Sequence, residues 1–154
     1  EANGAEHSRV KETRKLIRRV KLPRTIKYLE RIFCGCHCLE EVVFDDNLED
    51  VSSHVFNGCV SLKTNEYENT IYLGTKQNPY YLVIGTKADN VKLHPNTKVI
   101  ASRALLNCTV EVPAAIECFA YSTASWESKV TFKVTVGSSA HKYCISAGYD
   151  FIEI

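Results

Sequence analysis

The chain has 154 residues and a formal net charge of +1, with 45% hydrophobic and 24% charged residues. These values suit one globular domain and exclude collagen-like, low-complexity and compositionally disordered chains. The longest apolar stretches are only a few residues long, so no membrane-spanning helix is expected. The charge is unevenly distributed, because residues 1–31 hold ten Lys or Arg against four Glu, whereas residues 32–62 hold six acidic residues and no Lys or Arg. The N-terminal region therefore joins two segments of opposite charge.

The N-terminal segment, residues 1–10, is polar and lacks the apolar core of a signal peptide. The chain also contains no methionine. We expect either a cytosolic protein or a mature or truncated piece of a longer one, and the absence of an initiating Met favours the piece.

The first predicted element lies within a basic run, residues 14–24. Such a run can bind nucleic acid or anionic lipid through phosphate contacts. The alternative is that Ile17, Val20 and Leu22 form the core-facing side of a strand, which leaves the basic residues on its solvated side. We favour the strand, because no aromatic residues that could stack on bases are interleaved with the basic ones.

The next two elements are copies of one repeat. Residues 32–39, IFCGCHCL, and residues 55–62, VFNGCVSL, share the pattern apolar-Phe-x-Gly-Cys-x-x-Leu. The Gly of each copy permits a backbone turn that a side chain would obstruct, and Phe33 and Phe56 are expected to stack. A short strand is predicted after the first copy, with three inward-facing residues: Leu39, Val42 and Phe44.

Cysteines cluster in the first copy. Residues 34–38, CGCHC, place three thiols and an imidazole within five positions, and these are soft ligands suited to zinc or copper(I). Against a metal site, Cys36 is already the repeat cysteine, equivalent to Cys59 and Cys108, and no spaced second pair of ligands follows. We therefore expect no metal and no cofactor, and we predict that these three are buried free thiols. Seven cysteines cannot all pair within one chain. One disulfide among the other four cysteines is an alternative that the sequence does not decide: Cys34, Cys38, Cys118 and Cys144.

His54 follows Asp50, Ser52 and Ser53, which invites a catalytic-triad hypothesis. We favour a solvated position for His54, in the convex half of the repeat. The sequence holds no phosphate-binding loop, dinucleotide-binding motif or nucleophile elbow. The chain is therefore not expected to be an enzyme.

The later copies are less regular. Residues 99–108, VIASRALLNC, carry Leu105 in place of Phe and Asn107 in place of Gly. Asn107 also begins a formal glycosylation sequon, but a backbone role at the Gly position is preferred. A worn copy starts at Pro113, with apolar residues at the expected offsets: Ile116, Phe119 and Ala124.

A period of about 20 to 29 residues with these aliphatic positions marks a leucine-rich-repeat solenoid, whose neighbouring coils bury a common core. The unit LP-x-x-I…F-x-G-C-x-x-L-x-x-V-x-F resembles the BspA-like leucine-rich repeats of bacterial and protist surface proteins. Residues 71–83 resemble the hairpin-like coil inserted among those repeats, and residues 134–154 resemble their C-terminal closure. The resemblance implies one solenoid domain over residues 1–154, with few helices and three parts: repeats over 17–136, an atypical inserted coil at 67–91 and a cap at 137–154.

The closing segment is predicted to be a short helix followed by a strand. Ser138 or Ser139 can cap the helix N-terminus, Gly148 supplies the turn after it, and residues 149–154 end as a strand. The inward residues of the helix are expected at helical spacing: Ala140, Tyr143, Cys144 and Ala147. Such a cap covers the open edge of the last coil.

Solenoids bind partners through the outward positions of their stacked strands. In three successive coils these positions are Arg18, Arg19 and Lys21, then Glu40, Glu41 and Val43, then Lys63, Thr64 and Glu66. The resemblance implies a cell-surface or secreted recognition and adhesion protein with a protein or glycan ligand, and the physical argument independently favours a non-catalytic binding module. The alternative is an intracellular scaffold or a nucleic-acid-binding protein that uses the basic segment, with nucleic acid the less favoured partner.

Overall fold

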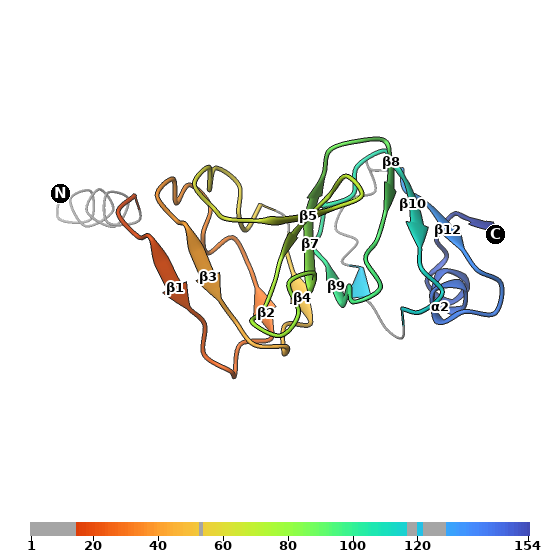
Figure 1. Ribbon diagram of the computed structural model, residues 1–154, viewed down its shortest axis with the longest axis horizontal. Coiled ribbons are helices and arrows are strands. Elements are labelled where there is room, and N and C mark those ends of the chain that lie inside the picture. Colours follow the sequence, from red (N-terminus) through yellow and green to blue (C-terminus); the bar gives the residue numbers. More distant parts are fainter. Residues whose placement is uncertain (1–14, 53, 117–119, 122–128) are drawn as a thin grey trace, which may run out of the picture.

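The computed structural model describes residues 15–52, 54–116, 120–121 and 129–154. These residues form an elongated solenoid of short strands (Figure 1). In the regular coils, each strand pairs in parallel with the equivalent strand of the next coil. In the N-terminal part, two such pairs form, each offset by 22 positions: β1 (Arg19–Lys21) with β3 (Glu41–Val43), and β2 (Tyr28–Leu29) with β4 (Asp50–Val51). The predicted leucine-rich-repeat solenoid is confirmed.

The C-terminal part repeats this arrangement. One sheet has four parallel strands in the order β8 (Asn90–Lys92), β10 (Thr109–Val112), β12 (Thr131–Val134) and β13 (Phe151–Glu153). On the opposite side of the coils, β9 (Val99–Ile100) pairs in parallel with β11 (Ala120–Tyr121). Figure 1 shows these strands stacked along the long axis toward the C-terminus.

An insert of three consecutive antiparallel strands, which we call the hairpin, interrupts the regular coils. Three strands form it in chain order: β5 (Asn65–Tyr67), β6 (Thr70–Leu73) and β7 (Leu82–Thr86). Glu68 and Asn69 have φ angles of 43° and 64°, so the turn between β5 and β6 has the two left-handed residues that favour a tight hairpin. β7 then pairs in parallel with β9, which returns the chain to the solenoid.

The hairpin overturns one expectation. Lys63, Thr64 and Glu66 were expected to continue the row of outward residues begun by β1 and β3. Instead β5 pairs with β6, and the backbone link to β3 here is the bond from the Lys63 N–H to the Glu40 carbonyl, 3.0 Å. All three side chains are exposed, as expected, but the strand that follows Lys63 and Thr64 pairs with β6 and does not extend the sheet of β1 and β3.

The core follows the repeat positions. Leu39, Val42 and Phe44 are all buried, as predicted. Phe33 and Phe56 stack with their ring centroids 5.8 Å apart and their planes at 15°, which confirms the predicted register of the two coils.

The repeat turns share one backbone conformation. Gly35 and Gly58 both have a φ of 77°, and Asn107 has a φ of 49° at the equivalent position of the third coil. Asn tolerates this left-handed region better than most residues. The preferred backbone role of Asn107 is therefore confirmed.

The C-terminal cap consists of α2 (Ser139–Ala147) and β13. The side chain of Ser138 accepts a hydrogen bond from the His141 N–H, and Gly148 closes the helix with a φ of 72°. Ala140 and Cys144 are buried and Tyr143 is half-buried, but Ala147 is exposed, contrary to expectation, because it lies in the last helical turn. The worn fourth copy is only partly described: Ile116 is buried, whereas Phe119 and Ala124 lie outside the described residues.

Candidate binding surfaces

The basic run forms the solvated side of β1, as the favoured interpretation predicts. Arg18, Arg19 and Lys21 are exposed, while Val20 is half-buried and packs against the core. Alternate residues of a strand point to opposite faces, and this periodicity separates the basic side chains from the apolar ones. The surface begun by these residues and those of β3 is called the strand face below.

The basic and acidic rows of the strand face pair with each other. Arg18 lies 2.8 Å from Glu40, and Arg19 lies 2.7 Å from Glu41. Both pairs span 22 positions, the register offset between β1 and β3. The rows therefore do not present separate basic and acidic stripes to a partner, because each charge already has an opposite charge beside it.

A second pair of charges repeats this pattern at the far end of the same coils. Lys27 lies 2.6 Å from Glu49. Their hydrogen bond raises the pKa of Lys27 and lowers the pKa of Glu49. Arg24 and Asp45 are likewise 2.8 Å apart. The first two coils are thus joined by ion pairs on both sides of the turn at Pro23.

The third predicted row is dispersed. Lys63 and Thr64 are exposed, and the Lys63 amine is 3.9 Å from Glu40. Glu66 pairs with Lys87 of the hairpin rather than with β3. Val43, expected to be exposed, is half-buried. The structure therefore brings the first two predicted rows together and separates the third from them.

A groove with a volume of about 360 Å³ runs beside β3, where the hairpin turns away. The Glu41 N–H donates to the Arg18 carbonyl, and the Val43 carbonyl accepts from the Leu22 N–H. Alternate residues of a parallel strand direct their backbone groups to opposite sides, so the N–H and C=O of Val42 face the groove. Among the described residues, no backbone partner pairs with them there.

A second part of the strand face was missed by the sequence reasoning. In the sheet β8-β10-β12, Asn90, Thr109 and Thr131 lie in one register row. The next outward row contains Lys92, Glu111 and Lys133, with Lys92 and Glu111 2.7 Å apart. The hydrogen bond to Glu111 raises the pKa of Lys92. These rows border a polar hollow of about 230 Å³ next to the β5–β6 turn.

A signal for these rows was present in the sequence. Val91 and Leu93, Val110 and Val112, and Phe132 and Val134 alternate with polar residues, and this alternation is typical of half-buried strands. All six are buried. Because the inserted hairpin breaks the regular spacing of the repeats, these strands could not be assigned by counting from the first two copies.

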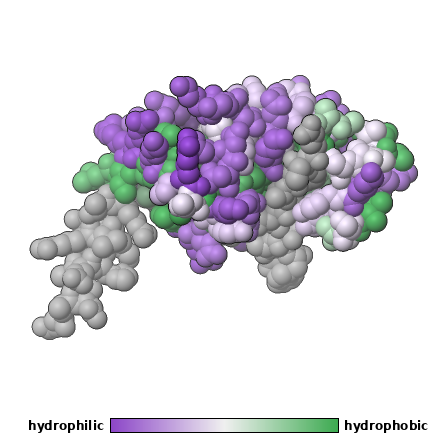
Figure 2. Space-filling view, turned by 90° about the horizontal axis from the view of Figure 1, so that it is seen from below, coloured by the Kyte–Doolittle hydropathy of each residue, from purple (hydrophilic) through white to green (hydrophobic). Residues whose placement is uncertain are grey.

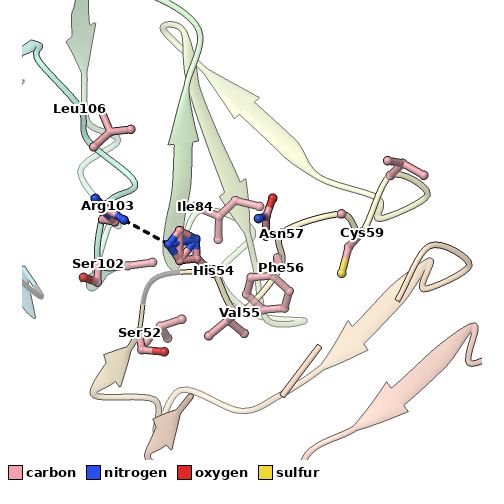
Figure 3. A pocket seen from close by; sticks show the side chains of 14 residues that line it. Ser52, His54, Val55, Phe56, Asn57, Cys59, Ile84, Ser102, Arg103 and Leu106 are labelled. Carbon is pink, nitrogen blue, oxygen red and sulfur yellow. Dashed lines mark hydrogen bonds between the residues drawn. The ribbon is translucent and has the colours of Figure 1, made fainter. Parts of the chain in front are cut away.

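The opposite, convex side holds a larger groove, of about 530 Å³, called the convex groove below. It separates the turn at residues 54–60 from the turn at residues 101–106, and Ile84 of β7 lines it between them (Figure 3). In this groove the Arg103 guanidinium lies 3.2 Å from the His54 imidazole. Leu106 and Val60 are 49% and 82% exposed, so the groove has apolar side chains at its rim.

The environment of His54 does not support the triad hypothesis. Its ring nitrogen contacts Arg103 rather than a carboxylate, and Ser53 lies outside the described residues. Within the described ranges, no group of three or more His, Cys, Asp or Glu side chains could hold a metal ion.

The repeat cysteines are only partly as predicted. Cys36 and Cys108 are buried free thiols, but Cys59 is half-buried, which corrects the expectation of three buried thiols. Cys59 borders the convex groove, so no further coil covers it. Its thiol donates to the Phe33 carbonyl at 3.1 Å, and burial raises its pKa to about 11. Of the other four, Cys34, Cys38 and Cys144 are free thiols and Cys118 lies outside the described residues.

The remaining surface is mostly hydrophilic when seen from below, with hydrophobic areas toward the two ends of the molecule (Figure 2). In the part of the chain that the structure describes, no helix is long and apolar enough to cross a membrane.

Comparison with known proteins agrees with the repeat architecture. The family described as BspA type leucine rich repeat region (6 copies) matches residues 12–117. A solved structure of a leucine rich cell surface protein from Faecalibacterium prausnitzii A2-165 is similar, with 10% sequence identity and a TM-score of 0.31. The match covers 89% of this chain and 59% of that one, so the chain spans little more than half of that protein's length. No curated protein sequence matches the chain.

Proposed function

Because the chain belongs to the BspA-type leucine-rich-repeat family, we propose that it is a non-catalytic recognition module of a cell-surface or secreted protein, and that it binds a protein or glycan ligand through its strand face. The observation that carries this proposal is the alignment of outward side chains in the parallel sheet β8-β10-β12. Three strands place Asn90, Thr109 and Thr131 in one row and a charged row beside it. A rigid array of donors and acceptors at fixed spacing can recognise an extended ligand with little ordering cost.

The N-terminal part of the strand face supports the same role in a different way. The groove beside β3 offers the unpaired N–H and C=O of Val42 to an incoming chain. Main-chain hydrogen bonds to a strand edge are a recurring way of holding an extended peptide. The two parts of the strand face flank the β5–β6 turn, so one extended ligand that spans both is the arrangement we favour.

A nucleic-acid role finds less support. Arg18 and Arg19 of the basic run already pair with carboxylates at 2.7–2.8 Å, and a phosphate would have to displace those partners. Retention on a polyanion column should therefore be weak, and a low concentration of added salt should be enough to elute the protein. Strong, salt-dependent retention that disappears in the variant Arg18→Glu/Arg19→Glu would favour the nucleic-acid alternative.

The proposal is tested with glycan arrays and a displayed peptide library, followed by affinity measurements on the ligands found. Lys133→Glu changes the strand face in β12, while Lys142→Glu makes the same charge change on the exposed side of α2. We expect Lys133→Glu to weaken binding by at least about tenfold, the effect of losing one important interface residue, and Lys142→Glu to leave it within about twofold. A ligand that binds both variants equally well does not use the strand face.

A further inference from the structure

The outer edge of β3 is a strand edge whose pairing stops after one hydrogen bond. On its inner side, β3 pairs with β1 along its whole length. On its outer side, the Lys63 N–H donates to the Glu40 carbonyl at 3.0 Å, and the chain then leaves toward β5 near the middle of the molecule (Figure 1). Val42 is the next residue whose backbone groups face outward, and among the described residues no backbone group pairs with them. The edge therefore offers a donor and an acceptor to a further strand.

This edge borders space for a short extended chain. The groove beside it has a volume of about 360 Å³, within the roughly 300–1,000 Å³ of sites that take drug-sized ligands. Its apolar lining comes from Val42, Val43 and Phe44 and from Leu73, the last residue of β6. In an added strand, the side chain directly opposite Val42 points to the same face of the sheet as Val42. An apolar side chain at that position therefore extends the apolar lining.

The charges around the groove favour an acidic ligand. The two acidic residues in its described lining, Glu40 and Glu41, already have arginine partners at 2.8 and 2.7 Å. Two exposed lysines also line the groove. Lys63 lies 3.9 Å from Glu40, beyond hydrogen-bond distance, and Lys76 has no ion-pair partner in the described part of the chain. Carboxylates on a ligand therefore meet two lysines that no carboxylate of the described chain holds in a hydrogen bond.

We propose that the outer edge of β3 binds a short, extended, acidic segment of a partner protein, which adds a strand to the sheet of β1 and β3. The main chain of the segment pairs with the N–H and C=O of Val42, and an apolar residue of the segment lies opposite Val42. Acidic residues next to it lie against Lys63 and Lys76. This inference rests on the proposed function, because it names the ligand class for the N-terminal part of the strand face.

The probe is a fluorescein-labelled hexapeptide that alternates Val and Glu, and its binding to the whole chain is measured by fluorescence anisotropy. We expect saturable binding with a Kd below about 1 mM. The same peptide with Lys in place of Glu should bind at least about tenfold more weakly, because it meets the two lysines of the groove. Equal binding of the two peptides, or no binding of the first, would overturn this inference. The proposed function is decided separately, by the effect of Lys133→Glu on the ligands found with arrays and libraries.

Main-chain pairing is tested with methylated peptides. Only alternate residues of a strand direct their N–H groups to one neighbour, so methylation of either the three Val or the three Glu amides removes the donors that face β3. We expect one of these two peptides to bind at least about tenfold more weakly than the parent, because it leaves the Val42 carbonyl without a donor. The other should lose much less. Parent affinity in both methylated peptides would show that the ligand does not add a strand.

Matched variants locate the site. Lys76→Glu reverses an exposed charge that lines the groove, whereas Lys142→Glu makes the same change on α2, away from it. We expect Lys76→Glu to weaken binding of the Val–Glu peptide about threefold to tenfold at low salt, and added salt to reduce this difference. Lys142→Glu and Lys133→Glu should leave binding within about twofold. Unchanged affinity in Lys76→Glu, or an equal loss in Lys133→Glu, would overturn the assignment to β3.

Discussion

The guanidinium of Arg19 lies 2.7 Å from the carboxylate of Glu41, and the two residues are Cα partners in the parallel register of β1 and β3. Arg18 and Glu40 repeat the relationship one position earlier. The excess positive charge before residue 31 and the excess negative charge after it are therefore matched across one coil boundary. A one-residue slip of the register would separate these partners and also turn Val20 and Val42 outward.

The first prediction concerns this charge match. In the variant Arg18→Glu/Arg19→Glu, four carboxylates face each other across β1 and β3, and like charges directly opposite destabilise a sheet. We expect the free energy of unfolding to fall by roughly 1–2 kcal/mol, since exposed pairs are worth under about 1 kcal/mol each. Urea denaturation at low salt measures it. Adding Glu40→Arg and Glu41→Arg should restore most of the loss; a fourfold variant no more stable than the double one would contradict the pairing.

The second prediction compares the two stacked rings. Phe33 is 4% exposed, whereas Phe56 is half-buried beside the convex groove. Phe33→Ala should therefore cost roughly 3–5 kcal/mol, the usual loss for an emptied aromatic site. Phe56→Ala should cost less, about 1.5–3 kcal/mol, because part of its surface is already in water. Chemical denaturation of both variants provides the comparison, and a larger loss for Phe56→Ala would show that its outer side is covered.

The repeat pattern predicted much of the fold. Phe33, Phe56 and the two repeat glycines predicted the coil register, because a period of equivalent residues can stack in only one way. The cap was also predictable, since Ser138 and Gly148 have strong local preferences at helix ends. What failed was the continuation past the second coil, where the hairpin between Asn65 and Thr86 diverts the chain.

The candidate surfaces were predictable only in part, for the same reason. Arg19 and Glu41 could be placed on one face by strand alternation, but their direct pairing depends on the register offset of 22. The convex groove could not be predicted at all. It lies between the second and third turns, and its lining includes Ile84 of the inserted hairpin. The repeat pattern does not predict how an insert packs against the coils.

The third prediction tests the repeat turn. A Cβ at Gly58 would lie 3.4 Å from the Cα of Gly35, at a φ of 77° that side chains rarely adopt. Gly58→Ala should therefore cost about 1 kcal/mol or more. At the equivalent position, Asn107→Gly relaxes a φ of 49° but loses the bond that the Asn107 side chain accepts from the Lys129 N–H. These effects oppose each other, so its stability should change by under about 0.5 kcal/mol. Similar losses in the two variants would argue against equivalent turns.

The fourth prediction concerns thiol reactivity. Cys34 is exposed, whereas burial raises the pKa values of Cys59, Cys108 and Cys144, that of Cys59 to about 11. The thiolate is the reactive form, so raised pKa values and poor access both slow alkylation at pH 8. Timed iodoacetamide labelling followed by peptide mass spectrometry should show Cys34 modified first among these four. Early labelling of Cys59 would instead indicate that the second turn opens readily.

The last prediction concerns pH. The ring of His94 stacks on Tyr80 with centroids 4.0 Å apart and meets Tyr67 edge-on at 4.9 Å, while its Nδ1 accepts from the Asn96 N–H at 3.0 Å. A protonated ring could not accept that bond, and burial lowers the pKa of His94 in the folded chain. The unfolded chain, with an ordinary histidine pKa of about 6.5, then binds more protons than the folded one in this range. The stabilising effect is therefore complete above the unfolded pKa and is lost as the pH falls from there toward the folded pKa.

We expect the free energy of unfolding to decrease between pH 7.5 and pH 5.5, and this decrease to be shallower in His94→Gln. His37→Gln, an exposed control, should keep the wild-type slope, and an unchanged slope in His94→Gln would show that another group is responsible.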